Sequence, residues 1–73
     1  MATTFHLQID TGGAAFTDPD GNPSPAAAAM EVARILSVTA NRLRLRGSLD
    51  ERHGFTLRDA NGNTVGHAGL VQP

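Results

Sequence analysis

The chain has 73 residues, a mass of 7.6 kDa and no cysteine, which leaves room for one small domain over residues 1–73 and excludes disulfide scaffolds, thiolate zinc sites and cysteine nucleophiles. Its 40% hydrophobic and 18% charged residues are typical of a folded globular domain, and six arginines against seven acidic residues give a net charge of -1. Such a charge does not attract polyanions globally, and a compact radius of about 11 Å leaves little room for a deep pocket or a cofactor.

Apolar and polar residues alternate from Phe5 to Asp10, which predicts a half-buried strand over residues 3–11. This pattern differs from a signal-peptide core, and no apolar run reaches the roughly 18 residues of a membrane span. We therefore expect a cytoplasmic protein. Residues 12–24 are rich in turn formers and predict a loop, which Phe16 is expected to anchor to the core.

A long helix is predicted from Pro25 to about Arg46. Ser24 offers a hydroxyl for the free amides of the first turn, proline suits the first helical position, and Gly47 supplies a left-handed end. Apolar positions at spacings of three and four predict one inner stripe, made of Ala28, Val32, Ile35, Leu36, Thr39 and Leu43. At about 33 Å the helix is longer than a strand of about 25 Å, so part of it should overhang the sheet.

Residues 55–70 predict a hairpin around the turn Asp59 to Asn63. A two-residue loop would pair Leu57 with Gly66. A three-residue loop with a left-handed Gly62 would instead pair Leu57 with Val65 and residue 55 with residue 67. The second register is preferred because a slip of one residue would move Val65 to the solvent face.

The order strand, helix, strand, strand predicts an α+β fold, in which a right-handed crossover and a hairpin build a three-stranded sheet with one long helix packed on one face. The other face of the sheet is expected to be bare. It should carry the polar side chains His6, Gln8, Asp10, Thr56, Arg58 and Thr64. This surface suits water and also a partner.

Residues that could carry chemistry do not form a recognisable site. Asp18, Asp20 and Asn22 resemble the start of a calcium loop, but the glycine and glutamate that such a loop needs at its sixth and twelfth positions are replaced by proline and alanine. The preferred register places His6 and His67 on opposite faces, with His67 partly buried beside the phenylalanine at position 55 and His53 in a connection. No metal, cofactor or catalytic residue is therefore assigned, and an enzyme is not expected.

Two features of the helix surface point to partners. Val38 and Leu45 lie off the inner stripe on one flank, where they could form a weak homodimer seam or contact another protein, with Arg34 and Arg42 at the rim. Alternatively, Arg42, Arg46 and Arg58 could meet nucleic-acid phosphates, although arginines in the last helical turns also complement the helix dipole. The candidate partner-binding residues are Val38, Leu45, Arg34, Arg42, His6, Gln8 and Arg58.

Four stretches, FHLQIDT, AAF, EVARIL and LRDANGNTVG, together resemble short proteins encoded by phages and mobile elements that have no assigned function. The resemblance covers about half of the chain and carries over no catalytic residue. It implies a small accessory protein or inhibitor that binds and blocks a host protein, with an anti-defence protein as one such type. The sequence therefore favours a protein-binding module without catalysis, with a nucleic-acid-binding module as the alternative, and no membrane partner.

Overall fold

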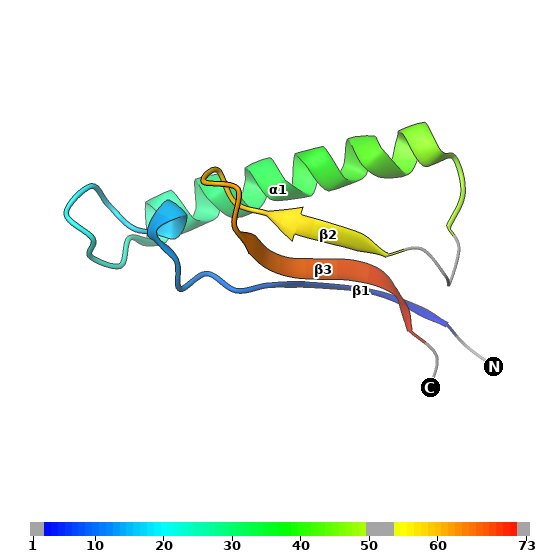
Figure 1. The fold of residues 1–73 in the computed structure, drawn as a ribbon, viewed down its shortest axis with the longest axis horizontal. Coiled ribbons are helices and arrows are strands. Elements are labelled where there is room, and N and C mark those ends of the chain that lie inside the picture. The colour runs from blue at the N-terminus through cyan, green and yellow to red at the C-terminus, as the bar shows by residue number, and fades with distance from the viewer. Residues whose placement is uncertain (1–2, 50–53, 72–73) are drawn as a thin grey trace.

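The computed structural model describes residues 3–49 and 54–71. In chain order they form strand β1 (Thr4–Ile9), the short 3-10 helix η1 (Ala14–Phe16), helix α1 (Pro25–Arg46) and strands β2 (Phe55–Arg58) and β3 (Thr64–Val71). The sheet order is β1-β3-β2, and β3 runs antiparallel to both neighbours. Helix α1 lies along one face of this sheet (Figure 1). The predicted β-α-β-β fold of the α+β class is confirmed.

Both ends of α1 lie where the sequence placed them. The Ser24 hydroxyl accepts a hydrogen bond from the Ala27 amide at 3.1 Å. At the other end Gly47 has φ 76°, and its amide donates to the Leu43 carbonyl at 2.9 Å. Proline just inside the start and a left-handed glycine just past the end fix the helix length locally.

The inner face of α1 differs from the predicted stripe at one position. Ile35 and Thr39 are buried, whereas Leu36 is 45% exposed. A helix turns about 100° per residue, so the line through Ile35 leaves Leu36 on the flank. Glu31 takes part in the buried face instead, with only 7% exposure. The prediction that Leu36 belongs to the buried stripe was therefore wrong. The helix instead buries Glu31, on the other side of the stripe, where its carboxylate has hydrogen-bond partners.

The hairpin combines parts of both predicted registers. Leu57 pairs with Gly66 and Phe55 with Ala68, so the preferred pairing was wrong for β2. Gly62 is nevertheless left-handed, at φ 81°. A β-bulge between Leu57 and Arg58 shifts the ladder by one residue, which lets Val65 still pack against the core.

The same five-residue turn occurs twice, at Asp18–Asn22 and at Asp59–Asn63. In each, the aspartate carboxylate accepts the amides two and four residues later, and the aspartate carbonyl accepts the amide of a left-handed glycine. The first turn is closed by an isolated bridge between Thr17 and Pro23. Of the residues that resemble the start of a calcium loop, Asp18 is thus the acceptor of a turn, and Asp20 and Asn22 donate their backbone amides to it. The repeat was not predicted because it spans only D-x-[DN]-G-N.

The core is small and the molecule is elongated. Phe16, Ile35, Phe55, Leu57 and Ala68 form the buried cluster, so Phe16 anchors the loop as predicted. The overhanging start of α1 packs on η1. The molecule measures 46 × 26 × 18 Å. Its radius of gyration, 13.7 Å, exceeds the expected value of about 11 Å because a helix longer than the sheet sets the long axis. None of the described helices is long and apolar enough to cross a membrane.

Candidate partner-binding surface

The face of the sheet that α1 leaves uncovered carries polar side chains from all three strands. Gln8 of β1 pairs with His67 of β3, which pairs with Thr56 of β2, so these three side chains form one row across the sheet. His6 lies on the same face, Arg58 ends the edge strand β2 beside the hairpin turn, and all five side chains are exposed. The predicted bare polar face is therefore present.

His6 and His67 lie on this same face, which corrects the prediction that they face opposite ways. The error follows from the hairpin register, because a shift of one residue reverses every side chain of β3. For the same reason His67 is exposed rather than partly buried beside Phe55. His53 falls outside the described residues.

A hollow of about 400 Å³ opens on this face above Gly69. Gly69 lies opposite His6 in the ladder, and a Cβ atom placed on it would meet nothing closer than the Gly54 Cα at 3.4 Å. The hollow exists because the central strand has no side chain at that point. Its rim includes His6, Thr56, His67 and Val71, and no Asp, Glu or Arg side chain of the described residues lines it.

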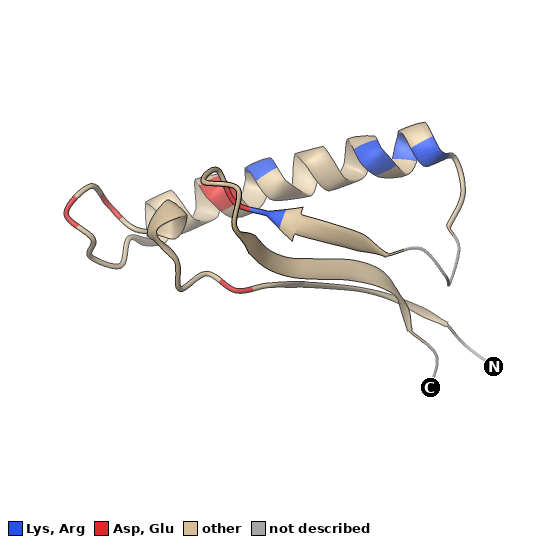
Figure 2. Cartoon of the chain, viewed as in Figure 1, with Lys and Arg blue, Asp and Glu red and all other residues tan. Residues whose placement is uncertain are grey.

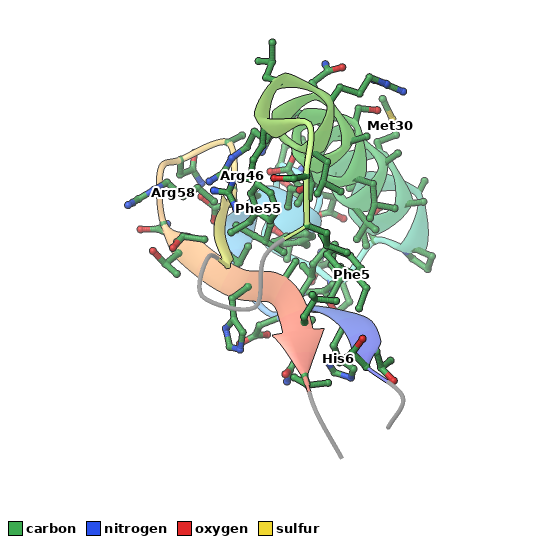
Figure 3. The ribbon with its side chains drawn as sticks, turned by 90° about the vertical axis from the view of Figure 1, so that its right-hand side faces the viewer. Phe5, His6, Met30, Arg46, Phe55 and Arg58 are labelled. Atoms are coloured by element: carbon green, nitrogen blue, oxygen red, sulfur yellow. The ribbon has the colours of Figure 1, made fainter. Side chains whose placement is uncertain are left out.

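The helix arginines are used to hold α1 against the sheet. Arg42 donates to the Thr56 carbonyl at 2.8 Å, and its guanidinium lies 5.0 Å from the centre of the Phe55 ring. Arg46 lies 4.3 Å from the same ring (Figure 3). Arg44, on another side of the helix, donates to the Asn41 side chain. Figure 2 shows basic residues near the middle of α1 and in its last turns.

Arg34 belongs to a polar cluster at the hairpin end of the helix. Two of its nitrogens contact the Glu31 carboxylate at 2.7 and 3.0 Å, and it also donates to the Arg58 carbonyl at 3.1 Å. Glu31 accepts a third hydrogen bond from the Ala60 amide at 2.7 Å. Hydrogen bonding to Arg34, helped by the Ala60 amide, holds the pKa of Glu31 below its usual value, although burial and the nearby charge of Asp59 act in the opposite direction.

The same pair raises the pKa of Arg34, chiefly through the hydrogen bonds to Glu31. The sequence predicted Arg34 at the rim of a dimer seam and did not predict this cluster. The i, i+3 spacing of the two residues was a visible signal for their pairing. Nothing in that spacing indicates the third partner, because Ala60 is 29 positions away in the sequence.

Val38 and Leu45 are exposed, as their positions off the stripe predict. Val38 is 45% exposed and lines a groove of about 590 Å³ between α1 and the hairpin, together with Arg34, Arg42 and Arg58. Leu45 is 88% exposed and lies outside this groove. The two residues thus share a flank without forming one hollow.

The described residues, 3–49 and 54–71, hold no cluster of metal-ligating side chains. No three His, Cys, Asp or Glu side chains gather there to hold a metal ion, and every buried polar side-chain atom has a hydrogen-bond partner. The described surface thus offers a hollow of about 400 Å³ above Gly69 and a groove of about 590 Å³ between α1 and the hairpin, and the first lies on the bare face of the sheet.

Comparison with known proteins adds no relative. The chain matches no family model, no curated protein and no solved structure.

Proposed function

We propose that this chain is a protein-binding module without catalysis, which acts by occupying a surface of a partner protein. The observation that supports it is the hollow above Gly69 on the face of the sheet that the helix leaves bare. A three-stranded sheet presents a flat surface wherever side chains fill it. A hollow at its centre can receive one protruding side chain of a partner, which is how many interfaces are anchored.

The chemistry of the hollow favours an apolar or aromatic side chain. Its floor is strand backbone around Gly69, its wall includes the half-exposed Val71, and two imidazoles flank it. The surrounding Gln8 and Thr56 offer uncharged hydrogen-bonding groups for the rim. The resemblance to short phage-encoded proteins makes a cytoplasmic host protein the proposed partner, and occlusion of its surface the proposed action.

The internal contacts of the arginines favour protein binding over nucleic-acid binding. Arg42 lies over the Phe55 ring and donates to the Thr56 carbonyl, and Arg46 lies over the same ring, so part of each guanidinium is already engaged. Arg58 donates to the Gly62 carbonyl at 3.3 Å beside its own turn. A phosphate would therefore meet only the remaining donors of these side chains, in a salt-sensitive contact.

The proposed test is a variant whose new side chain fills the hollow. In Gly69→Val the new side chain enters the hollow, and its Cβ has an ordinary contact distance to Gly54. Wild-type protein immobilised in lysate of its host should capture a partner identified by mass spectrometry, Gly69→Val should lose it, and the matched variant Leu45→Val, on the far surface, should keep it. Melting curves confirm that both variants fold.

Two results would overturn the proposal. One is capture by Gly69→Val at the wild-type level. The other is binding to mixed-sequence DNA or RNA whose affinity falls steeply with salt and depends on Arg42, because this pattern identifies phosphate contacts.

A further inference from the structure

The two outer edges of the sheet are treated differently. On the β2 side, the outward carbonyl of Thr56 accepts from Arg42 at 2.8 Å, and the outward carbonyl of Arg58 accepts from Arg34 at 3.1 Å. These helix side chains occupy the acceptors that an added strand would need. The β2 edge is therefore closed by the chain itself.

The β1 edge is open. The Asp10 amide donates to the Val65 carbonyl of β3 at 2.7 Å, which fixes the alternation of the backbone along β1. Residues an even number of positions from Asp10 direct their backbone groups toward β3, so Phe5, Leu7 and Ile9 direct theirs away from it. No described element lies beyond β1 in the sheet (Figure 1).

Nothing in the composition of β1 discourages pairing. Thr4–Ile9 holds no charged residue, proline or glycine, although proteins commonly use charge or proline to keep an edge strand from joining another. Phe5 is 38% exposed on the helix side of the strand, and His6 lies on the other side (Figure 3). Leu36, also half-exposed, is on the helix flank away from Arg34 and Arg42, and therefore on the β1 side.

The exposed area of the chain leaves room for one such contact. The accessible surface is 5089 Å², whereas a compact monomer of this mass exposes about 4300 Å². The difference of about 800 Å² is spread over the whole elongated chain, and it is of the order of the area that one partner contributes to a standard protein interface. A second copy of the same edge would cover apolar surface without bringing like charges together.

We propose that β1 pairs antiparallel with β1 of a second copy across a two-fold axis, which joins the two sheets into one of six strands. Leu7 lies opposite Leu7 of the second copy and Phe5 lies opposite Ile9, because this register uses all three outward-directed backbone positions. On the bare face His6 lies opposite Gln8 of the second copy. Both helices lie on the same face of the joined sheet. The proposal is independent of the proposed function.

The sequence predicted a homodimer seam elsewhere, at Val38 and Leu45, so a variant of these two residues serves as a matched control. Sedimentation of the unmodified chain should show a mass that rises from 7.6 kDa to twice that value with concentration. Phe5→Lys should weaken association by about tenfold or more, since it places a charge beside the second copy. Phe5 lies outside the buried cluster, so the variant should still melt cooperatively.

The double variant Val38→Lys, Leu45→Lys should dimerise like the unmodified chain. A monomer at all concentrations up to hundreds of micromolar overturns the proposal. Monomerisation by the Val38 and Leu45 changes, with Phe5→Lys unaffected, also overturns it and moves the seam to the helix.

Cysteine cross-linking tests the register without touching the core. The chain has no cysteine, so His6→Cys and Gln8→Cys each introduce a single thiol on the bare face. Opposed residues have Cα atoms about 4.5–5.5 Å apart, within disulfide range, while the diagonal His6 to His6 separation is about 8 Å. Mixed under oxidation, the two variants should give a disulfide heterodimer, and neither should cross-link alone. Self-linking of His6→Cys, or no linkage, contradicts this register.

Amide exchange supplies a readout that needs no substitution. In the monomer the amides of Phe5, Leu7 and Ile9 face solvent and should exchange quickly, while the alternate amides bonded to β3 are protected. In the dimer both sets are protected. Protection of Leu7 should therefore rise with protein concentration, and protection independent of concentration would contradict the pairing.

Discussion

Replacing Glu31 by alanine removes a buried carboxylate that joins the helix to the hairpin turn. The lost bond to the Ala60 amide, 2.7 Å long and made to a charged acceptor, contributes about 1.5–3 kcal/mol to stability. The pair with Arg34 adds little, because that arginine is largely exposed. We expect Glu31→Ala to lower the free energy of unfolding by about 2 kcal/mol, which lowers the Tm of a domain this size by about 8–16 °C.

The same residue gives the stability a pH dependence with a definite sign. Because the folded-state pKa of Glu31 lies below its ordinary value of 4.5, its stabilisation is complete above pH 4.5 and is lost as the pH falls through that value toward the folded-state pKa. Glu31→Gln retains a neutral acceptor and no longer titrates. Urea unfolding of both proteins should therefore give a stability difference that shrinks as the pH falls below 4.5. A difference that does not vary with pH would refute this account of Glu31.

Three further outcomes are expected. Gly66→Ala should destabilise the protein by about 3 kcal/mol or more, because the new Cβ would overlap the Gln8 carbonyl oxygen, whereas Gly69→Ala should melt within a few degrees of the unmodified chain. Asp59→Ala should cost about 1–3 kcal/mol in urea unfolding, since the amides of two turn residues lose their acceptor. Leu36→Asp should change monomer stability by about 1 kcal/mol or less because that side chain is half-exposed, and complete unfolding would return Leu36 to the core.

The parts of the fold that the sequence predicted correctly depend on neighbouring residues. A serine hydroxyl reaches an amide three positions away, a left-handed glycine ends its own helix, and alternation along β1 records which side is apolar. Each of these signals is complete within about seven residues. Strand, helix and hairpin limits were therefore correct to within a few residues.

The errors occurred where distant segments decide the outcome. The pairing register of β2 with β3 depends on a β-bulge. The bulge lets Val65 pack against the core although Leu57 pairs with Gly66. Without a bulge, the burial of Val65 and the pairing of Leu57 with Gly66 exclude each other, and the sequence did not predict the bulge. The burial of Glu31 in place of Leu36 depends on an amide donated from across the hairpin turn, which no helical periodicity contains.

The candidate surface was only half predictable for a related reason. The bare face and its residues followed from alternation, but the hollow depends on His6 standing opposite a glycine, and that pairing requires the strand order. The arginines were assigned to partners because their internal acceptors, the carbonyls of Thr56 and Arg58, belong to a strand edge whose position the sequence did not give.

The two proposals concern different parts of one sheet. Each can therefore be tested separately, although dimerisation would also affect partner binding. The hollow above Gly69 lies on the bare face of the central strand, while pairing uses the outer edge of β1. Pairing would place two copies of the hollow on one continuous face, so that a partner with two matching projections would bind with an increased effective concentration. Phe5→Lys should then weaken capture of such a bivalent partner without filling the hollow. Gly69→Val should abolish capture and leave the dimer intact, and loss of both properties in Gly69→Val would show that edge and hollow are one site.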